Sequence, residues 1–236
     1  MAVTFLQLTN RVLQVLGEDE ITVGVTEISD TYQKLVATFV NQIKEEVEDS
    51  HNWRKLRHSV DVTVTAGSNT ATITGTNERS RLLREYDPIS GIERPLVVDV
   101  TTPDQEFPVR EADLSRLLYL TDASTVTNSQ YSSQFAIDDS SGDTLDLYVY
   151  PSAVVNRTYR VNLITPQERI AFDAPQTAIT VPVRPIELGA LWYALEERGE
   201  ELGVSGVYSE QKYRKALDDA IGTDAADQGG YNLVPV

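Results

Sequence analysis

Cysteine is absent from this chain of 236 residues, which excludes disulfide bonds and thiolate metal sites. The absence of cysteine is compatible with a protein that is made and kept in a reducing cytoplasm. Histidine occurs only twice, so the usual ligand set of a zinc site is not available. No run of about 18 uncharged apolar residues occurs, and we expect no membrane-spanning helix. Residues 1–6 have neither the basic nor the apolar part of a signal peptide, so we expect none.

Positive charge is also scarce. Twenty Lys and Arg residues face thirty-six Asp and Glu residues, which gives a net charge of −16. A surface this acidic repels the phosphates of nucleic acids, so the composition argues against a DNA-binding protein. It is compatible with a pore through which DNA slides without sticking.

Two helices are predicted at the N-terminal end. Thr4 and Gln7 have the spacing of a capping box, and the apolar stripe that follows them ends at Gly17. A longer helix is predicted over residues 27–50, with Thr26 as its N-cap. Its one-sided apolar stripe predicts packing against other helices. That stripe contains Tyr32, Leu35, Phe39, Ile43 and Val47.

The middle of the chain, residues 59–180, is predicted to form a β-rich lobe. Val60, Val62 and Val64 alternate with polar residues, and a turn at residues 66–69 precedes a second alternating stretch. This pattern predicts a β-hairpin.

Further elements are predicted inside this lobe. Residues 134–138 and 144–150 flank a polar turn and predict a second hairpin, and residues 159–163 alternate as another strand. Residues 113–120 predict a short helix. The Ser-, Thr- and Asn-rich residues 121–133 predict an exposed loop.

The C-terminal end returns to helical periodicity. One helix is predicted from Pro185, a favoured first-turn residue, and another from about Ser205. Their predicted packing residues are Leu191, Leu195, Tyr213 and Leu217. After Gly222 the chain becomes small and polar, which predicts an extended tail over residues 225–236.

These segments together predict an α+β fold. Residues 1–58 and 181–224 form one helical bundle, and residues 59–180 are inserted as a separate β lobe.

No motif of catalytic chemistry is found. The chain has no phosphate-binding glycine loop, dinucleotide fingerprint, nucleophile elbow or zinc-protease helix. We interpret His51 and His58 as polar residues at a helix-to-strand junction that Trp53 anchors. The carboxylates between residues 138 and 146 lack calcium-loop spacing, because Gly142 stands where a ligand is required. We therefore predict no catalytic residue, no cofactor and no metal.

Four carboxylates lie near the end of the long helix: Glu45, Glu46, Glu48 and Asp49. The C-terminal end of a helix dipole prefers cations. We interpret these residues as a solvated helix face. Carboxylates at this end are mildly unfavourable for the helix, which is compatible with the binding of a basic partner surface.

Three segments, in this order, resemble the head-to-tail adaptors of tailed bacteriophages, a family that includes tail tubular protein A-like and portal-connector adaptors. The first is the N-terminal helix pair up to Trp53. The second is the strand pair LDLYVYP (145–151) and YRVNL (159–163), followed by residues 181–192. The third consists of Gly229, Gly230, Tyr231, Asn232 and Leu233.

The resemblance implies a structural virion protein of the neck or tail, assembled in the cytoplasm of the bacterial host. It implies a homo-oligomeric ring, a dodecamer, between the portal protein and the tail tube or nozzle, through which DNA passes without specific binding. The helical bundle is then the ring wall, residues 229–233 dock on the portal, and the β lobe faces the tail or the exterior. No membrane is involved.

Two other interpretations stay open. One is a tail-completion or tube-capping protein at the same ring position. The other, from a different class, is a carbohydrate-binding or glycan-degrading virion protein. A cleft with two carboxylates about 5–9 Å apart beside exposed aromatic residues favours the latter. A smooth acidic channel with apolar subunit contacts favours the adaptor.

Overall fold

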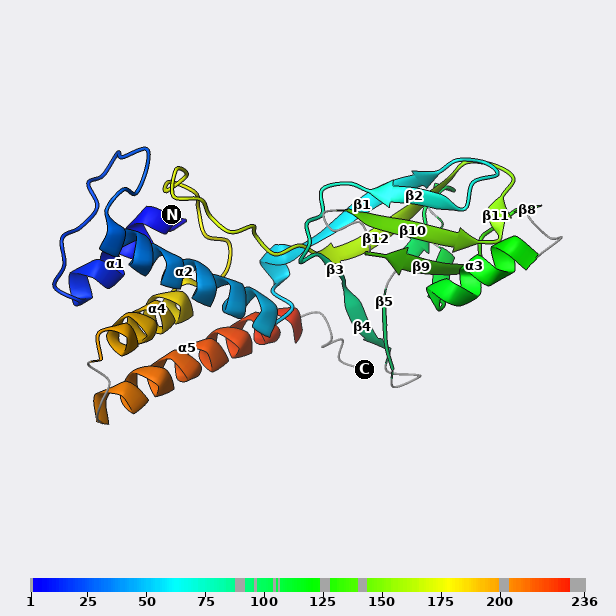
Figure 1. Ribbon diagram of the computed structural model, residues 1–236. Helices are drawn as coiled ribbons and strands as arrows, with labels where there is room; N and C mark the ends of the chain where they lie inside the picture. The colour runs from blue at the N-terminus through cyan, green and yellow to red at the C-terminus, as the bar shows by residue number, and fades with distance from the viewer. Residues whose placement is uncertain are drawn as a thin grey trace. The chain divides into compact units, whose positions relative to one another are not determined.

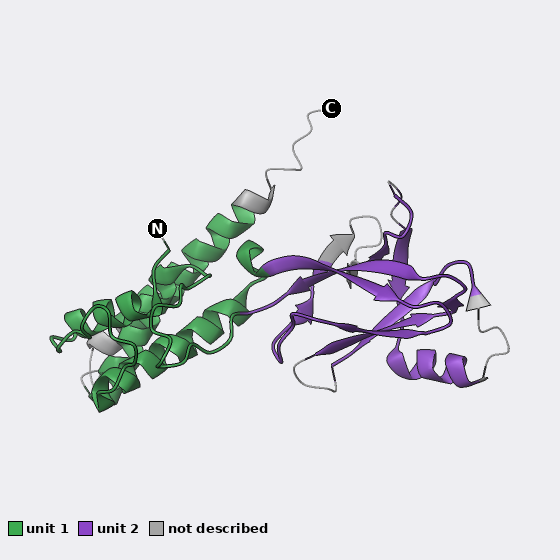
Figure 2. Cartoon of the chain, turned by 90° about the horizontal axis from the view of Figure 1, so that it is seen from above, with its two compact units in different colours: residues 1–56, 167–236 green, residues 57–166 purple. Residues whose placement is uncertain are grey.

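The computed structural model describes residues 2–87, 92–95, 97–103, 105, 107–123, 128–139, 144–199 and 204–229. The chain divides into two compact units, a helical unit of residues 1–56 and 167–236 and a β unit of residues 57–166 (Figure 2). The fold class is α+β, with the N- and C-terminal helices together and a β-rich part inserted between them. The predicted fold class is confirmed.

The first helix, α1 (Phe5–Val15), begins as predicted. The Thr4 hydroxyl accepts a hydrogen bond from the backbone N–H of Gln7 at 3.3 Å, and the Gln7 side chain accepts one from the Thr4 N–H at 3.1 Å. This reciprocal pair is the capping box. Gly17 follows the helix with φ of 70°, a left-handed conformation that ends helices.

The second helix, α2 (Thr31–Ser50), begins later than predicted. Its N-cap is Asp30, whose carboxylate accepts hydrogen bonds from the N–H groups of Tyr32 and Gln33. An Asp at this position satisfies two free donors and faces the positive end of the helix dipole. The predicted cap at Thr26 is therefore wrong.

The C-terminal helices are α4 (Val183–Glu197) and α5 (Val204–Gly229). α4 packs against α1, α2 and α5, and α1 packs against α2 (Figure 1). α5 includes residues 225–229, which were predicted as extended. Alanine favours helix strongly, so Ala225 and Ala226 continue the helix past Gly222.

Residues 167–182 form no helix or strand, yet they belong to the helical unit. The N–H of Phe5 donates to the carbonyl of Thr177 at 2.9 Å. The Asn41 side chain exchanges two hydrogen bonds with the backbone of Ile170, at 2.9 and 3.1 Å. The predicted β lobe extended to residue 180, whereas the β unit ends at residue 166, because the segment after it satisfies polar groups of the helices.

The described strands of the β unit are β1 (Arg57–Val64), β2 (Thr70–Ile73), β3 (Arg81–Leu82), β4 (Arg84–Asp87), β5 (Ile92–Pro95), β6 (Val97–Asp99), β7 (Phe107–Glu111), β8 (Asn128–Ser129), β9 (Gln134–Asp138), β10 (Leu145–Tyr150), β11 (Ser152–Ala153) and β12 (Arg157–Ile164).

Most of these strands form one large sheet with the strand order β1-β12-β6-β7-β9-β10-β2, and β3 pairs with β12. Its strand pairs are antiparallel except β7 with β9. Two small sheets pair β8 with β11 and β4 with β5. Two short helical elements accompany these strands. The helix α3 (Leu114–Ala123) packs on β9 and β10, which confirms the predicted short helix. A 3-10 turn, η1 (Arg54–Leu56), precedes the first strand.

The first predicted hairpin is wrong. β1 pairs along its whole length with β12, with Val62 opposite Tyr159, and β2 pairs with β10, with Ala71 opposite Leu147. β1 and β2 stand at opposite ends of the strand order but contact each other, so the sheet curls into a near-barrel. β12 offers β1 a partner of equal length, which the short β2 cannot. The second predicted hairpin, β9 with β10, is confirmed.

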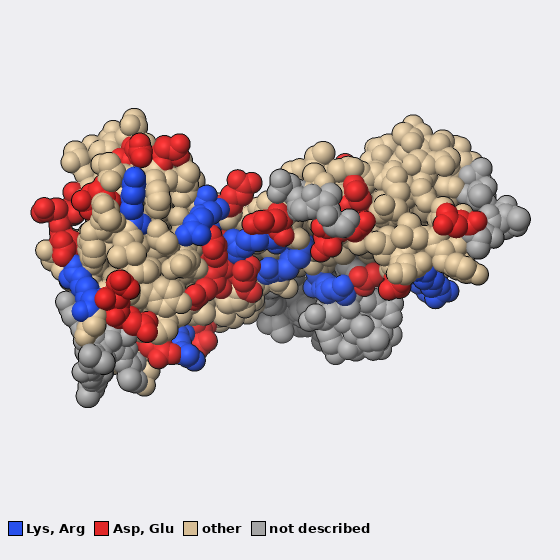
Figure 3. Space-filling model, in the orientation of Figure 1, with Lys and Arg blue, Asp and Glu red and all other residues tan. Residues whose placement is uncertain are grey.

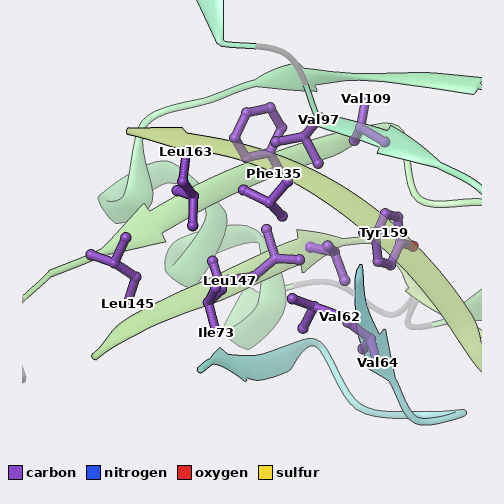
Figure 4. Packing of buried hydrophobic residues seen from close by; sticks show 12 residues of the cluster. Val62, Val64, Ile73, Val97, Val109, Phe135, Leu145, Leu147, Tyr159 and Leu163 are labelled. Carbon is purple, nitrogen blue, oxygen red and sulfur yellow. The ribbon is translucent and has the colours of Figure 1, made fainter. Parts of the chain in front are cut away.

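The inner face of this sheet is the core of the β unit. In Figure 4 the labelled side chains from different strands converge on one space, with Leu147 near Ile73 and Phe135 near Val97. Fully burying one Val, Leu, Ile or Phe side chain stabilises the fold by about 1.5–3 kcal/mol. The core residues are Val62, Val64, Ile73, Val97, Val109, Phe135, Leu145, Leu147, Val149, Tyr159, Val161 and Leu163. Among the described helices of the chain, none is long and apolar enough to cross a membrane.

Candidate functional site

The packing residues predicted for the helical unit fall into two groups. Ile43, Val47 and Tyr213 are buried, with exposures of 0 %, 0 % and 7 %. The other six are only half-buried: Tyr32, Leu35, Phe39, Leu191, Leu195 and Leu217. Helices α2, α4 and α5 therefore keep apolar area at the surface of the unit, as an interface between proteins requires.

Glu46 connects three helices. Its carboxylate accepts a hydrogen bond from the Tyr193 hydroxyl at 2.8 Å and another from the Tyr213 hydroxyl at 3.3 Å. The ring of Trp192 stacks on Tyr213, with centroids 6.1 Å apart. Burial and the neighbouring Glu46 carboxylate raise the pKa of Tyr193 to about 12 and that of Tyr213 to about 12. Glu46 is exposed, as predicted, but it also fixes α4 and α5 to α2.

Lys44 and Glu48 form a fully buried ion pair on α2. The Lys44 Nζ lies 3.2 Å from one oxygen of Glu48 and 3.3 Å from the other, and neither side chain is exposed. The ammonium also donates to the carbonyls of Gln167 and Glu168, at 2.8 and 3.2 Å. The prediction that Glu48 is solvated is wrong. A buried pair is tolerated here because these carbonyls complete the hydrogen bonding of the ammonium.

Arg198, the C-cap residue of α4, holds the ends of three elements together. Its Nε donates to the Tyr32 hydroxyl at 2.7 Å, and its Nη1 donates to the carbonyl of Leu16 at 3.1 Å. Its Nη2 forms an ion pair with Glu18. These contacts fix the segment that follows α1.

That segment, residues 17–30, is called the acidic segment below. It contains no Lys or Arg, and its acidic residues are exposed: Glu18, Asp19, Glu20, Glu27 and Asp30. Val23 near its middle is 86 % exposed. The Asn10 side chain exchanges two hydrogen bonds of 2.8 Å with the backbone of Ile21, and Ile28 is fully buried. The segment is thus anchored at two points and exposes Val23 between them.

A groove of about 570 Å³ runs between α4 and α5. Its charged lining is mainly basic, with Arg184, Lys212 and Lys215 against Asp219. Its apolar lining is Leu188, Tyr208 and Ala216. The Lys212 ammonium lies 4.1 Å from the ring centroid of Tyr208. This basic groove differs from much of the helical unit, where Figure 3 shows Asp and Glu side chains widely spread over the drawn face.

The helix-to-strand junction is anchored as predicted. Trp53 is buried and contacts the ring of His51 edge-on, with centroids 4.9 Å apart. The His51 Nε2 lies 3.1 Å from a carboxylate oxygen of Asp224. This contact fixes α5 near its C-terminal end. His58 is half-buried in β1.

The residues predicted to dock on the portal lie at the end of α5 and beyond. Gly229 is the last residue of the helix. Gly230, Tyr231, Asn232 and Leu233 lie outside the described residues.

The β unit also exposes apolar side chains. Phe107 and Tyr131 are 41 % and 42 % exposed, and their rings lie 5.6 Å apart. The Arg157 guanidinium lies 4.3 Å from the ring centroid of Tyr131 and forms a buried ion pair with Asp99 at 3.4 Å. The Arg157–Asp99 ion pair therefore lies beside the exposed rings of Tyr131 and Phe107 and supports them. Other exposed apolar residues of the unit are Leu118, Tyr119, Val154 and Val155.

The described residues contain no group of three or more His, Asp and Glu that could hold a metal ion. Asp138 and Asp146 face each other across β9 and β10, and the Thr72 hydroxyl donates to Asp146 at 2.7 Å. Gly142 lies outside the described residues.

Similarity to known proteins identifies the family of this chain. Among curated proteins no match to this chain is found. A family model described as SU10 adaptor protein matches residues 3–234, a range that includes all the described helices and strands of both units. The chain therefore belongs to the SU10 adaptor protein family, the phage head-tail adaptors that its sequence resembles.

Proposed function

We propose that this adaptor forms a homo-oligomeric ring, a dodecamer, between the portal and the tail tube or nozzle. The half-buried apolar residues on α2, α4 and α5 support a ring wall made by the helical unit. Subunits that join through two different surfaces form either a closed ring or an open filament. A ring is the form that a neck between two coaxial virion parts requires.

The negative charge of the chain supports a role in the DNA-ejection conduit. Each subunit has a net charge of −16, so a ring of such subunits repels the phosphates of passing DNA. Specific and non-specific DNA binding both rely on Lys and Arg contacts to phosphate, and in this chain acidic residues outnumber Lys and Arg by thirty-six to twenty. DNA therefore passes without being retained.

Two parts of the subunit take different partners in this proposal. Residues 229–233, at the end of α5 and beyond, dock on the portal. The β unit, with its exposed Phe107 and Tyr131, faces the tail tube or nozzle. Phe107 lies on β7, whose Val109 belongs to the packed core of the β unit.

The test is negative-stain microscopy of the purified protein mixed with the cognate portal ring. The full chain is expected to add a ring to the portal, and a chain that lacks residues 229–236 is expected to lose this docking. The double variant Val154→Ser/Val155→Ser is the control. It changes the β unit and leaves α5 intact, so it is expected to dock on the portal as the full chain does. A protein that never binds the portal contradicts the proposal, and binding only to the end of a tail tube supports a tail-completion protein instead.

A further inference from the structure

We infer that neighbouring subunits join by placing the acidic segment of one subunit, with Val23, in the basic groove between α4 and α5 of the next. This inference rests on the proposed ring and names the two surfaces that close it.

The first argument is charge. The acidic segment carries five carboxylates and no basic residue. The groove brings three cations together against one carboxylate, in a chain whose acidic residues outnumber its basic ones by thirty-six to twenty. Complementary charges across an interface guide association and select the orientation of the partner. The acidic segment of a second copy is therefore a matching occupant for this groove.

The second argument is the apolar content of both surfaces. Val23 is 86 % exposed, so its apolar side chain is available for contact with a partner. The groove offers Leu188, Ala216 and the ring of Tyr208, which is itself 57 % exposed. Contact between the segment and the groove removes apolar area of both from water.

The third argument is position within the helical unit. The acidic segment joins α1 to α2, and the groove lies between α4 and α5, so the two surfaces belong to different helix pairs (Figure 1). A subunit that uses both surfaces binds one neighbour on each side. Such a contact repeats from subunit to subunit and closes a ring when the rotation allows it.

The fourth argument is the fixed shape of the segment. Arg198 holds its start at Glu18, and Asn10 holds the backbone of Ile21. A segment that is already ordered loses little conformational freedom when it binds. Asp19 and Glu20, which are exposed between these anchors, are the carboxylates best placed to meet the basic groove.

Charge reversal tests the pairing. We expect Lys212→Glu/Lys215→Glu, or Asp19→Lys/Glu20→Lys, to raise the concentration needed for ring assembly by about tenfold or more, because like charges then face each other. A mixture of the two variants assembles again, since every contact pairs opposite charges when the variants alternate. A single chain with all four substitutions also assembles alone. Arg110→Glu/Arg116→Glu, with the same charge change on exposed positions of the β unit, assembles like the unmodified chain.

Cross-linking tests the contact itself, and the absence of native cysteine removes any background. A mixture of Val23→Cys and Tyr208→Cys chains is expected to give disulfide-linked dimers under oxidation, whereas a mixture of Val23→Cys and Tyr119→Cys chains does not. Rings that tolerate both charge reversals and give no such cross-link overturn this interface and leave the ring proposal intact. An unmodified chain that forms no ring, alone or on the portal, overturns both.

Discussion

At the residue scale, the Lys44–Glu48 pair makes the stability of the helical unit depend on single side chains. Replacing Glu48 by Gln keeps the shape of the side chain but removes the carboxylate that pairs with the buried Lys44 ammonium. Removing one partner of a buried pair costs about 3–5 kcal/mol, so we expect a loss of this size in the free energy of unfolding. Tryptophan fluorescence in a urea titration measures it, because Trp53 and Trp192, the only two tryptophans, both belong to the helical unit.

The matched control is Asp49→Asn, an exposed neighbour on the same helix. Its effect is expected to stay within about 0.5 kcal/mol. If Glu48→Gln is as mild as Asp49→Asn, the pair is not buried in solution.

The tyrosines bound to Glu46 predict a pH dependence. The pKa of Tyr193 and that of Tyr213 are raised from 10 to about 12, so both phenols hold their protons more tightly in the folded chain than in the unfolded one. Their contribution to stability is complete below pH 10 and is lost as the pH rises from 10 to about 12. Glu46→Gln lowers the pKa of both tyrosines toward 10, which an absorbance titration of the phenolates measures. Unchanged titration curves in the Glu46→Gln variant would show that the carboxylate does not act on them.

The sequence pattern predicted an apolar stripe on α2 but not how the charged residues of this helix are used. A Lys and a Glu four residues apart look the same on a solvated helix face and in a buried pair. The difference comes from the carbonyls of Gln167 and Glu168, which lie far away in the sequence. The hydrogen bonds to Glu46 were not predicted for the same reason, because its tyrosine partners come from α4 and α5.

At the element scale, the contact between α2 and α4 depends on a glycine. A Cβ added to Gly189 would lie 2.7 Å from the Ile43 side chain, closer than such atoms approach. Gly189→Ala is expected to destabilise the helical unit by about 1–3 kcal/mol, the usual cost of overpacking, despite a helix-propensity gain of about 1 kcal/mol. Tryptophan fluorescence during urea unfolding measures this as well.

Gly222 in α5 is the matched control, because a Cβ there meets nothing within 4 Å. Gly222→Ala is expected to stabilise the unit by up to about 1 kcal/mol. A Gly189→Ala variant that gains stability like Gly222→Ala would mean that α2 and α4 are not in close contact.

Local signals predicted most elements but not their partners. The capping box of Thr4 and Gln7 placed α1 correctly, and the alternation in β9 and β10 placed a hairpin. The alternation in β1 is equally clear, yet it does not reveal that β12 rather than β2 is the partner. Strand pairing depends on length and tertiary contacts, which local periodicity does not contain. The basic groove also escaped prediction, since its residues come from two helices whose packing the sequence does not specify in detail.

At the scale of the whole molecule, the proposed contact between acidic segment and basic groove predicts that ring assembly depends on salt. The distance over which charges act falls from about 10 Å at 0.1 M salt to about 3 Å at 1 M. The concentration needed for assembly is therefore expected to rise with salt, which analytical ultracentrifugation measures. Assembly that strengthens steadily with salt would indicate a purely apolar contact.

The ring beneath the portal is the central claim, and mass photometry of portal rings mixed with the adaptor tests it most directly. The account predicts a single heavier species, whose added mass equals a complete ring of 26.2 kDa subunits, with few partly filled portals. Portal rings that keep their own mass at every adaptor concentration, or gain subunits one by one without reaching a defined number, would contradict it.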